Sequence, residues 1–377
     1  MTEKLYEKDA YIKEFTARVS DCKPCETGFA VTLDKTAFFP EGGGQAGDKG
    51  IIDDVNVFDT QIENDVIYHY TDKPLNVGAT ITGKIDFDRR FGFMQNHTGE
   101  HIVSGIAHKL YGVNNVGFHL GEDIVTLDFD RELTREQLDE IERLANSKVW
   151  QNLPVTAYYP IDEELNNTDY RSKKEINGAV RLVEIKDTDI CACCAPHVKS
   201  TGEIGLIKLL DTERMRGGIR IALKCGAFAL DDYQLKYENI SQISALLSAK
   251  QENAAEVVKK LDEKYTLEKQ KINELKKKIA ELTIAVADEN TRCLFIGDCD
   301  VKDLQLIADK LHKKHGGIRG AFSGSGESFA FAICGEDNEL QQFFKKFKSE
   351  LTVRGGGRGG MMQGTVIATK ENIKLFF

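Results

Sequence analysis

Four side chains in two separate segments have the types and the spacing to bind one metal ion. His97 and His101 lie four residues apart, so on a helix their rings share one face and can converge on one point. Cys193 and His197 repeat this spacing in a cysteine-rich segment. Three imidazoles and one thiolate form a mixed nitrogen and sulfur set that suits Zn²⁺. We therefore expect the two segments to close on one metal ion.

The cysteine-rich segment offers three thiols, those of Cys191, Cys193 and Cys194. Cys193 forms a Cys-x-x-x-His pair with His197, whereas Cys194 forms a Cys-x-x-His pair with the same histidine. Spacing alone leaves the choice open. The alternative is a turn of buried cysteines, with histidines that serve only packing.

The elements that must position these side chains can be read from hydrophobic periodicity. An apolar stripe over 92–111 predicts a helix that carries both histidines of the first segment. The pattern over 180–185 predicts a strand that leads into the cysteine-rich segment, and 204–210 and 219–223 predict strands that leave it.

Residues 10–90 read mainly as short β-strands separated by turn residues, for example at 29–33, 66–70 and 80–85. Between them, the Thr36–Asp48 loop contains three successive glycines followed by Gln45. Glycines let a backbone approach a ligand closely, and the glutamine side chain both donates and accepts hydrogen bonds. Taken alone, however, this segment is better explained as a barrel turn that needs positive φ.

Length and composition describe an ordinary globular chain. Its 377 residues allow two or three domains, and no apolar run is long enough to span a membrane. The first residues lack the features of a signal peptide, and nine cysteines indicate reduced thiols, so we expect a cytoplasmic protein. The net charge of −10 does not advertise a nucleic-acid binder, although residues 291–377 carry 13 basic against 10 acidic side chains, or +3.

The C-terminal part begins with a long helical segment. Apolar residues between Val258 and Val286 alternate at spacings of three and four, which predicts a heptad seam within a helical spacer over 232–290. Residues 291–377 alternate β and α patterns. They contain a glycine-rich tail with Arg354 and Arg358, which we interpret as an ordered loop rather than a flexible RNA-binding segment.

These motifs, taken in order, resemble one family. The Thr36–Asp48 loop, His97-Thr-x-x-His101 and Cys193-x-x-x-His197-Val-x-x-Thr-Gly-Glu-Ile-Gly205 resemble the editing domain of alanyl-tRNA synthetase. The heptad helix and the Gly-Gly-Gly-Arg-Gly-Gly-Met-Met-Gln-Gly tail resemble the DHH-associated domain of that enzyme. The chain has no room for the aminoacylation domain, so it is similar to stand-alone trans-editing proteins of the AlaX type, in their long form.

The resemblance implies an α+β fold in four parts. These are a β-barrel subdomain with the glycine loop (1–90), an α/β zinc-binding editing domain (91–231), a helical coiled-coil spacer (232–290) and a C-terminal α/β DHH-associated tRNA-binding domain (291–377). It also implies an ATP-independent hydrolase that cuts the ester of mischarged tRNA(Ala), chiefly Ser-tRNA(Ala), with Gly-tRNA(Ala) as a second candidate. A homodimer through the spacer and the C-terminal domain is compatible with the heptad seam.

Carried over by motif, the Zn²⁺ ligands are His97, His101, Cys193 and His197, and the family spacing selects Cys193. Gln45 matches the glutamine of the glycine loop, and Thr36 matches a threonine beside the bound amino acid. We expect Arg354 and Arg358 to contact tRNA through phosphates and sugars. The segment between the last two ligands reads Cys-Ala-Pro, where the synthetase usually has Gly-Gly-Thr, which makes this loop stiffer and bulkier.

Two roles for the zinc ion are open. A bound cation can lower the pKa of water toward neutrality, or it can hold the substrate while a second water attacks. Four protein ligands close the coordination shell, as in structural sites, which favours positioning and polarisation of the substrate. The alternative functions are a non-catalytic, zinc-stabilised tRNA-binding module and a threonyl-type editing deacylase. A DHH-type phosphoesterase is disfavoured because its Asp-His-His motif is absent.

Overall fold

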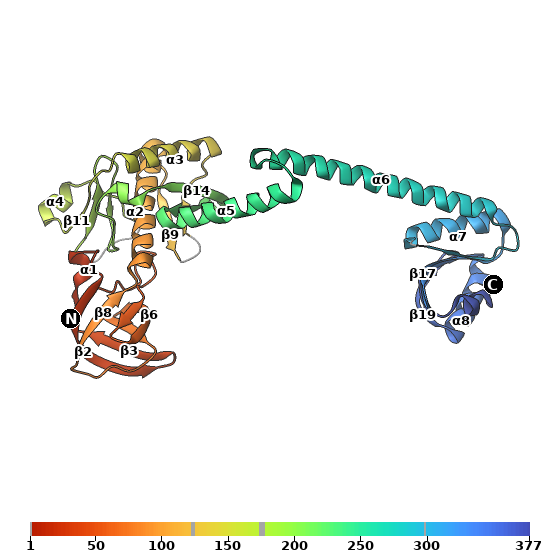
Figure 1. Ribbon diagram of the computed structural model, residues 1–377, viewed down its shortest axis with the longest axis horizontal. Helices are drawn as coiled ribbons and strands as arrows, with labels where there is room; N and C mark the ends of the chain where they lie inside the picture. The colour runs from red at the N-terminus through yellow and green to blue at the C-terminus, as the bar shows by residue number, and fades with distance from the viewer. Residues whose placement is uncertain (1, 122–124, 173–177, 298) are drawn as a thin grey trace. The chain divides into compact units, whose positions relative to one another are not determined.

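The computed structural model describes residues 2–121, 125–172, 178–297 and 299–377 (Figure 1). The chain divides into two compact units, Met1–Ile240 and Ser241–Phe377. Both units mix helices and strands, in agreement with the α+β class expected from the sequence. The boundary lies inside one helix, α5 (Gly226–Leu247), near the start of the predicted spacer.

The first unit begins with a closed six-stranded barrel in the order β2-β3-β7-β6-β5-β8. Its strands are β2 (Glu14–Cys25), β3 (Gly28–Leu33), β5 (Gly50–Ile52), β6 (Val55–Glu63), β7 (Val66–Thr71) and β8 (Thr80–Ile85). Alternating side chains of these strands fill the barrel core, as the period of two in their burial requires. Two short strands, β1 (Glu3–Lys4) and β4 (Lys35–Thr36), pair in parallel beside helix α1 (Leu5–Lys8).

The rest of the first unit contains two antiparallel sheets. The four-stranded sheet has the order β14-β15-β10-β9, and the three-stranded sheet has the order β11-β12-β13. Their strands are β9 (Asn115–Leu120), β10 (Val125–Phe129), β11 (Val155–Tyr158), β12 (Leu182–Ile185), β13 (Asp189–Ala192), β14 (Ile207–Met215) and β15 (Gly218–Cys225). The helices beside them are α3 (Arg135–Trp150), α4 (Asp162–Asn167) and the short η1 (Thr201–Ile204).

Helix α2 (Phe87–Tyr111) is the central element of this unit, and Figure 1 shows it rising from the barrel toward the two sheets. It begins five residues earlier than the apolar stripe predicts, because the Asp86 side chain accepts a hydrogen bond from the Arg89 amide and caps the helix. It ends at Gly112, whose φ of 60° is the left-handed conformation that favours glycine. Residues 92–107 of α2 are buried, so both faces of the helix pack inside the unit.

The second unit contains a five-stranded sheet in the order β16-β17-β18-β20-β19. Its strands are β16 (Cys293–Ile296), β17 (Arg319–Ser325), β18 (Ser328–Cys334), β19 (Thr352–Arg358) and β20 (Met361–Ile367). Its helices are α6 (Ala254–Val286), α7 (Val301–His315), α8 (Asp337–Glu350) and α9 (Lys370–Lys374), and the turn η2 (Gln251–Asn253) precedes α6.

The predicted helical segment over 232–290 contains two helices, because the chain leaves α5 through Ser248 in a left-handed conformation before α6 begins. One detail differs from the sequence-based expectations. The glycine-rich tail is a β-hairpin rather than a loop, since β19 pairs with β20 from Thr352 to Arg358. A Cβ at Gly355 would lie 2.1 Å from the Gln363 carbonyl oxygen, so only glycine allows this close pairing of backbones.

The helices in the described part of the chain are too short or too polar to cross a membrane.

Candidate metal centre and adjoining cavity

Helix α2 delivers the first pair of predicted site residues. His97 and His101 are both buried, and their ring centroids lie 5.4 Å apart. They lie on neighbouring turns of a helix that is buried at this point, so the cluster is shielded from bulk water. The expected stacking of two histidines at a spacing of four is therefore confirmed.

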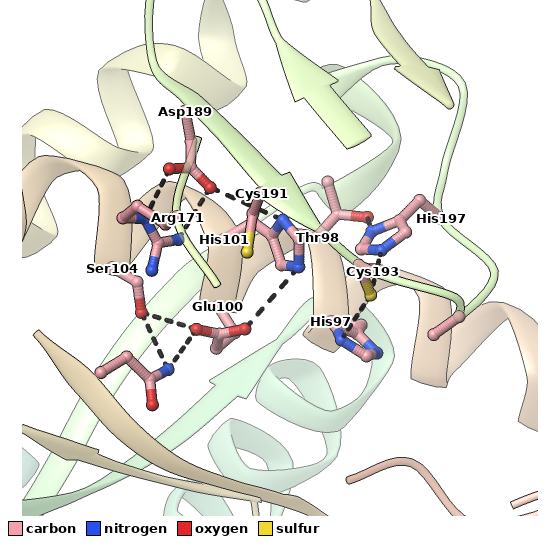
Figure 2. A network of polar contacts seen from close by, with 12 residues as sticks. His97, Thr98, Glu100, His101, Ser104, Arg171, Asp189, Cys191, Cys193 and His197 are labelled. Carbon is pink, nitrogen blue, oxygen red and sulfur yellow. Dashed lines mark hydrogen bonds and ion pairs between the residues drawn. The ribbon is translucent and has the colours of Figure 1, made fainter. Parts of the chain in front are cut away.

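Strand β13 and the loop after it deliver the second pair. The Cys193 Sγ atom lies 3.5 Å from His97 Nε2 and 3.4 Å from His197 Nε2. The His197 ring lies 4.8 Å from the His97 ring and 4.6 Å from the His101 ring, measured between centroids. Figure 2 shows the Cys193 thiol between the rings of His97 and His197.

The four residues fit the requirements of a metal site. Their ligand atoms all lie within 4.8 Å of one another. Bond lengths of about 2.0–2.3 Å around a tetrahedral ion would separate ligand atoms by roughly 3.3–3.8 Å, close to the two contacts of Cys193. The structure thus brings together all four predicted side chains in an arrangement that can hold one metal ion.

Thr98 fixes the tautomer of His197. The Thr98 hydroxyl donates its single hydrogen to the Met94 carbonyl at 2.8 Å, and its oxygen accepts a hydrogen bond from the Val198 amide at 3.3 Å. The contact of 3.0 Å between this oxygen and His197 Nδ1 must therefore be donated by the ring. Nε2 then carries the lone pair, and it is Nε2 that faces Cys193. The ring is held in the tautomer that a metal ligand needs.

Gln45 has the same relation to His97. Its side-chain carbonyl lies 3.0 Å from His97 Nδ1, which directs Nε2 of that ring toward Cys193. The Gln45 Nε2 atom is buried and has no hydrogen-bond partner among the described residues. Gln45 is itself fully buried and lies behind His97 rather than on the cavity wall, so its contact in this structure is with a cluster residue.

His101 is supported by a charged chain of two residues. Arg171 donates two hydrogen bonds of 2.7 Å to the two carboxylate oxygens of Asp189. Asp189 Oδ2 in turn lies 3.6 Å from His101 Nδ1. On the other side, Glu100 is buried and accepts a hydrogen bond from Ser104 (Figure 2). It accepts another from Asn115. His101, Asp189 and Cys191 also form a group of possible ligand atoms. The Arg171 guanidinium on Asp189 disfavours a second cation there.

The glycine loop lies directly against this cluster. Gly43 and Gly44 form its turn, with φ values of 62° and 84°. A Cβ at Gly44 would lie 2.4 Å from the Phe118 carbonyl oxygen, so a larger residue is excluded at that position. The loop is fastened to α2 by a buried ion pair, in which Arg90 contacts both carboxylate oxygens of Asp48.

A cavity of about 590 Å³ adjoins the cluster. His97, His101 and Cys193 lie in one part of its wall, and Gly43 and Gly44 lie beside them. The remaining wall is formed by side chains from the N-terminal segment and from the two sheets. Cavities of this size suit a small organic ligand, and they are larger than a single amino acid requires.

Thr36 does not line this cavity. Its hydroxyl lies 2.8 Å from His69 Nε2 and accepts a hydrogen bond of 3.1 Å from the Phe38 amide. His69 Nδ1 donates to the Val31 carbonyl. Burial lowers the pKa of His69 to about 4, so its ring is neutral near pH 7. This geometry differs from the expectation that Thr36 contacts the amino acid, because its hydrogen-bonding capacity is used inside the barrel.

Arg354 and Arg358 lie in the other unit, on the exposed edge strand β19 of the five-stranded sheet. Both side chains are exposed.

Sequence reasoning missed Thr98, Asp189, Arg171 and Arg90. Each contacts a partner far along the chain, for example 99 residues away for Thr98 and His197. No spacing rule reports such contacts. The one available signal was position, since Thr98 adjoins His97 and Asp189 precedes the cysteine-rich segment.

Comparisons with known proteins agree with the geometry. Residues 180–221, which contain Cys193 and His197, match a family model described as the threonyl and alanyl tRNA synthetase second additional domain. Residues 5–89, which contain the barrel, match the model described as tRNA synthetases class II (A).

Individual relatives extend the similarity over nearly the whole chain. The alanine–tRNA ligase of Pyrococcus abyssi is 33% identical over 97% of this chain and 42% of its own length. The corresponding ligase of Halorubrum lacusprofundi is 31% identical over 94% of this chain and 40% of its own. The alanyl-tRNA editing protein AlaX-L of Pyrococcus horikoshii is 27% identical over 99% of this chain and 96% of its own length. The chain therefore spans about two fifths of the ligases and nearly all of the editing protein.

Proposed function

Because this chain belongs to the family of alanyl-tRNA editing proteins and alanine–tRNA ligases, we propose that it is an editing deacylase that hydrolyses the ester of mischarged tRNA(Ala). The observation that carries the proposal is the convergence of His97, His101, Cys193 and His197, the first three of which line a cavity large enough for an aminoacyl ester. Serine is the expected amino acid, with glycine as the second candidate.

The four side chains would hold one Zn²⁺ ion. When bound, zinc supplies a fixed positive charge beside the ester, where it polarises the carbonyl group and attracts the substrate. Gln45, Thr98 and Asp189 then act on the rings rather than on the substrate, because each faces an Nδ1 atom of one histidine. Such partners fix the orientation of ligands and raise their basicity. Burial of α2 keeps bulk water away from this side of the site.

Two further surfaces support binding of tRNA and of a second chain. Arg354 and Arg358 project from an exposed strand edge and suit phosphate contacts. The heptad seam of α6 is exposed, with Leu261, Leu275 and Ile279 each more than half accessible. The face of α6 that packs within its own unit contains Ala280 and Ile284 instead. We infer that the seam pairs with a second copy of this chain.

The test is deacylation by purified, zinc-loaded protein. Ser-, Gly- and Ala-tRNA(Ala) are compared with Ser-tRNA(Thr) as the non-cognate control. We expect rapid loss of serine from tRNA(Ala), slow loss of alanine, and loss of activity when zinc is removed by a chelator and verified as absent.

Three outcomes would contradict parts of this proposal. Stable esters in the presence of folded, zinc-loaded protein would leave a zinc-stabilised tRNA-binding module. Faster cleavage of Ser-tRNA(Thr) would indicate a threonyl-type deacylase. Full activity without zinc would remove the metal from the chemistry.

A further inference from the structure

Arg181 is a buried cation at the wall of the cavity that has only neutral partners in the described structure. It lies just before β12 and is 8% exposed. Its Nη1 atom donates two hydrogen bonds of 3.0 Å, to the carbonyl oxygens of Cys193 and Ala195. Both acceptors are backbone groups, and no carboxylate pairs with this guanidinium among the described residues. A buried charge normally has a partner of opposite sign.

The geometry leaves part of the guanidinium for a ligand. Arginine has five N–H donors in a planar fork, and the two carbonyl bonds occupy those on Nη1. The other three have no hydrogen-bond partner within the described ranges, and the side chain lines the cavity. Arg181 is thus held rigidly by one nitrogen, with the rest of its fork available to an anion.

A second cation lies at the same cavity. Lys4, from β1, lines the wall, and its Nζ lies 3.6 Å from Glu7 Oε1. Glu7 also accepts a hydrogen bond of 3.0 Å from the Tyr159 hydroxyl. Burial raises the pKa of Tyr159 to about 12, and the charge of Arg181 opposes that rise, so the field of Arg181 reaches this part of the wall. Glu7 offsets Lys4 in part, which leaves Arg181 as the main uncompensated cation.

We propose that Arg181, assisted by Lys4, binds the 5′-phosphate of the terminal nucleotide of the substrate. This inference rests on the proposed function, and it assigns a different part of the substrate to each end of the cavity. The aminoacyl ester lies at the cluster of His97, His101 and Cys193, and the nucleotide extends from it along the wall that holds Arg181. A guanidinium fork matches phosphate geometry with two parallel hydrogen bonds. It also gives an acidic protein of net charge −10 a local attraction for nucleic acid.

The alternative is that Arg181 only clasps the loop that carries Cys193. Minimal substrates separate the two roles: 2′(3′)-O-seryl-adenosine, which has no phosphate, and 2′(3′)-O-seryl-AMP, which has the 5′-phosphate. We expect the parent protein to cleave the phosphate-bearing ester with the higher kcat/KM. Arg181→Met should lower kcat/KM for that ester about tenfold more than for the phosphate-free ester, because only the first loses a contact with the phosphate.

Three variants complete the experiment, and zinc content is measured for each. Arg181→Lys keeps the charge and should recover part of the preference for the phosphate-bearing ester. Lys4→Met should reduce this preference less than Arg181→Met does. Lys199→Met removes an exposed cation that follows His197 but does not line the cavity, so its preference should equal that of the parent. If Arg181→Met loses zinc or does not fold, the preference for the phosphate-bearing ester is compared between the parent and the variants Arg181→Lys and Lys4→Met.

The outcomes distinguish this inference from the proposed function. An equal loss of kcat/KM for both esters in the folded Arg181 variants would overturn the phosphate assignment. If those variants are unfolded, an unchanged preference of Lys4→Met for the phosphate-bearing ester would overturn it. In both cases the proposal of a deacylase would remain. A parent protein that cleaves no seryl ester, including Ser-tRNA(Ala), would remove both.

Discussion

Two rings of the four-residue cluster have their tautomers set by neighbouring side chains before any metal binds. Thr98 accepts from His197 Nδ1, and the Gln45 carbonyl faces His97 Nδ1. The metal-facing nitrogens therefore need no rearrangement of protons. At the scale of single residues, we expect this preorganisation of the rings to raise the affinity of the cluster for zinc.

We expect Thr98→Val to lower the affinity for zinc by roughly 10- to 100-fold, because Val has no acceptor for His197 Nδ1. Thr98→Ser keeps the hydroxyl and serves as the matched control. The affinity is measured by competition with a chromophoric chelator. Equal affinities in the two variants would show that the hydroxyl does not orient the ring.

His69 makes stability depend on pH. Its pKa is about 4 in the folded protein, because burial disfavours the charged ring, and about 6.5 in an unfolded chain. The unfolded chain thus binds more protons between these values. The stability that depends on the neutral His69 ring is therefore fully present above pH 6.5. It is lost as the pH falls toward 4, which lowers the free energy of unfolding by roughly 3 kcal/mol in total.

The measurement is the free energy of unfolding in urea at several pH values, compared between the parent and His69→Gln. We expect the difference between the two proteins to shrink as the pH falls from 6.5 to 4. A constant difference over this range would contradict the assignment to His69.

At the scale of elements, the ion pair of Arg90 and Asp48 joins helix α2 to the glycine loop. Both side chains are buried, and Arg90 also donates to the Ala10 and Ala37 carbonyls. The pair holds the loop that places Gln45 behind His97. Removal of one partner leaves the other charge buried without compensation.

We expect Asp48→Asn to lower the free energy of unfolding by about 3–5 kcal/mol, because the Arg90 charge is then unpaired in the interior. The exposed pair of Arg135 and Asp139 gives the control, since Asp139→Asn should cost less than about 0.5 kcal/mol. Urea unfolding measures both. Similar losses of unfolding free energy in the two variants would show that burial does not determine how much an ion pair stabilises the protein.

At the scale of the whole molecule, exposed surfaces can bind partners outside the chain. The exposed seam of α6 predicts a concentration-dependent dimer, measured by sedimentation equilibrium. Leu275→Lys with Ile279→Lys should shift the protein to monomer, because charge enters the apolar seam. Asn273→Lys with Glu281→Lys adds lysines beside the seam and should leave the dimer intact. A monomeric parent at high concentration would exclude the pairing.

The second unit supplies the expected contact with tRNA. Arg354→Met with Arg358→Met should weaken binding of tRNA and lower the slope of log affinity against log salt by about 2, or one for each lost phosphate contact. Hydrolysis of seryl-adenosine should be unaffected. Lys260→Met, on the exposed face of α6, is the control cation. Unchanged binding in the double variant would place the tRNA contact elsewhere.

The sequence by itself determined the features that depend on local spacing. Short β-type stretches separated by turn residues predicted barrel strands such as β3, β7 and β8, and an apolar stripe predicted α2. The His-x-x-x-His spacing predicted that His97 and His101 converge, because residues four apart on a helix share a face wherever the helix lies. Cys193 and His197 lie in the loop after β13, and the choice of Cys193 came from the family resemblance. Turn details were less accessible, as the hairpin formed by the glycine-rich tail shows.

Only the tertiary structure decided the surroundings of the cluster. It turned Thr36 toward His69, placed Thr98 and Asp189 on ring nitrogens, and brought Arg181 to the cavity wall. These contacts join residues from different elements, and a side chain with several possible partners takes the one that packing brings within reach. Local periodicity carries no information about that choice, so the cluster of four side chains was predictable and the groups that orient its rings were not.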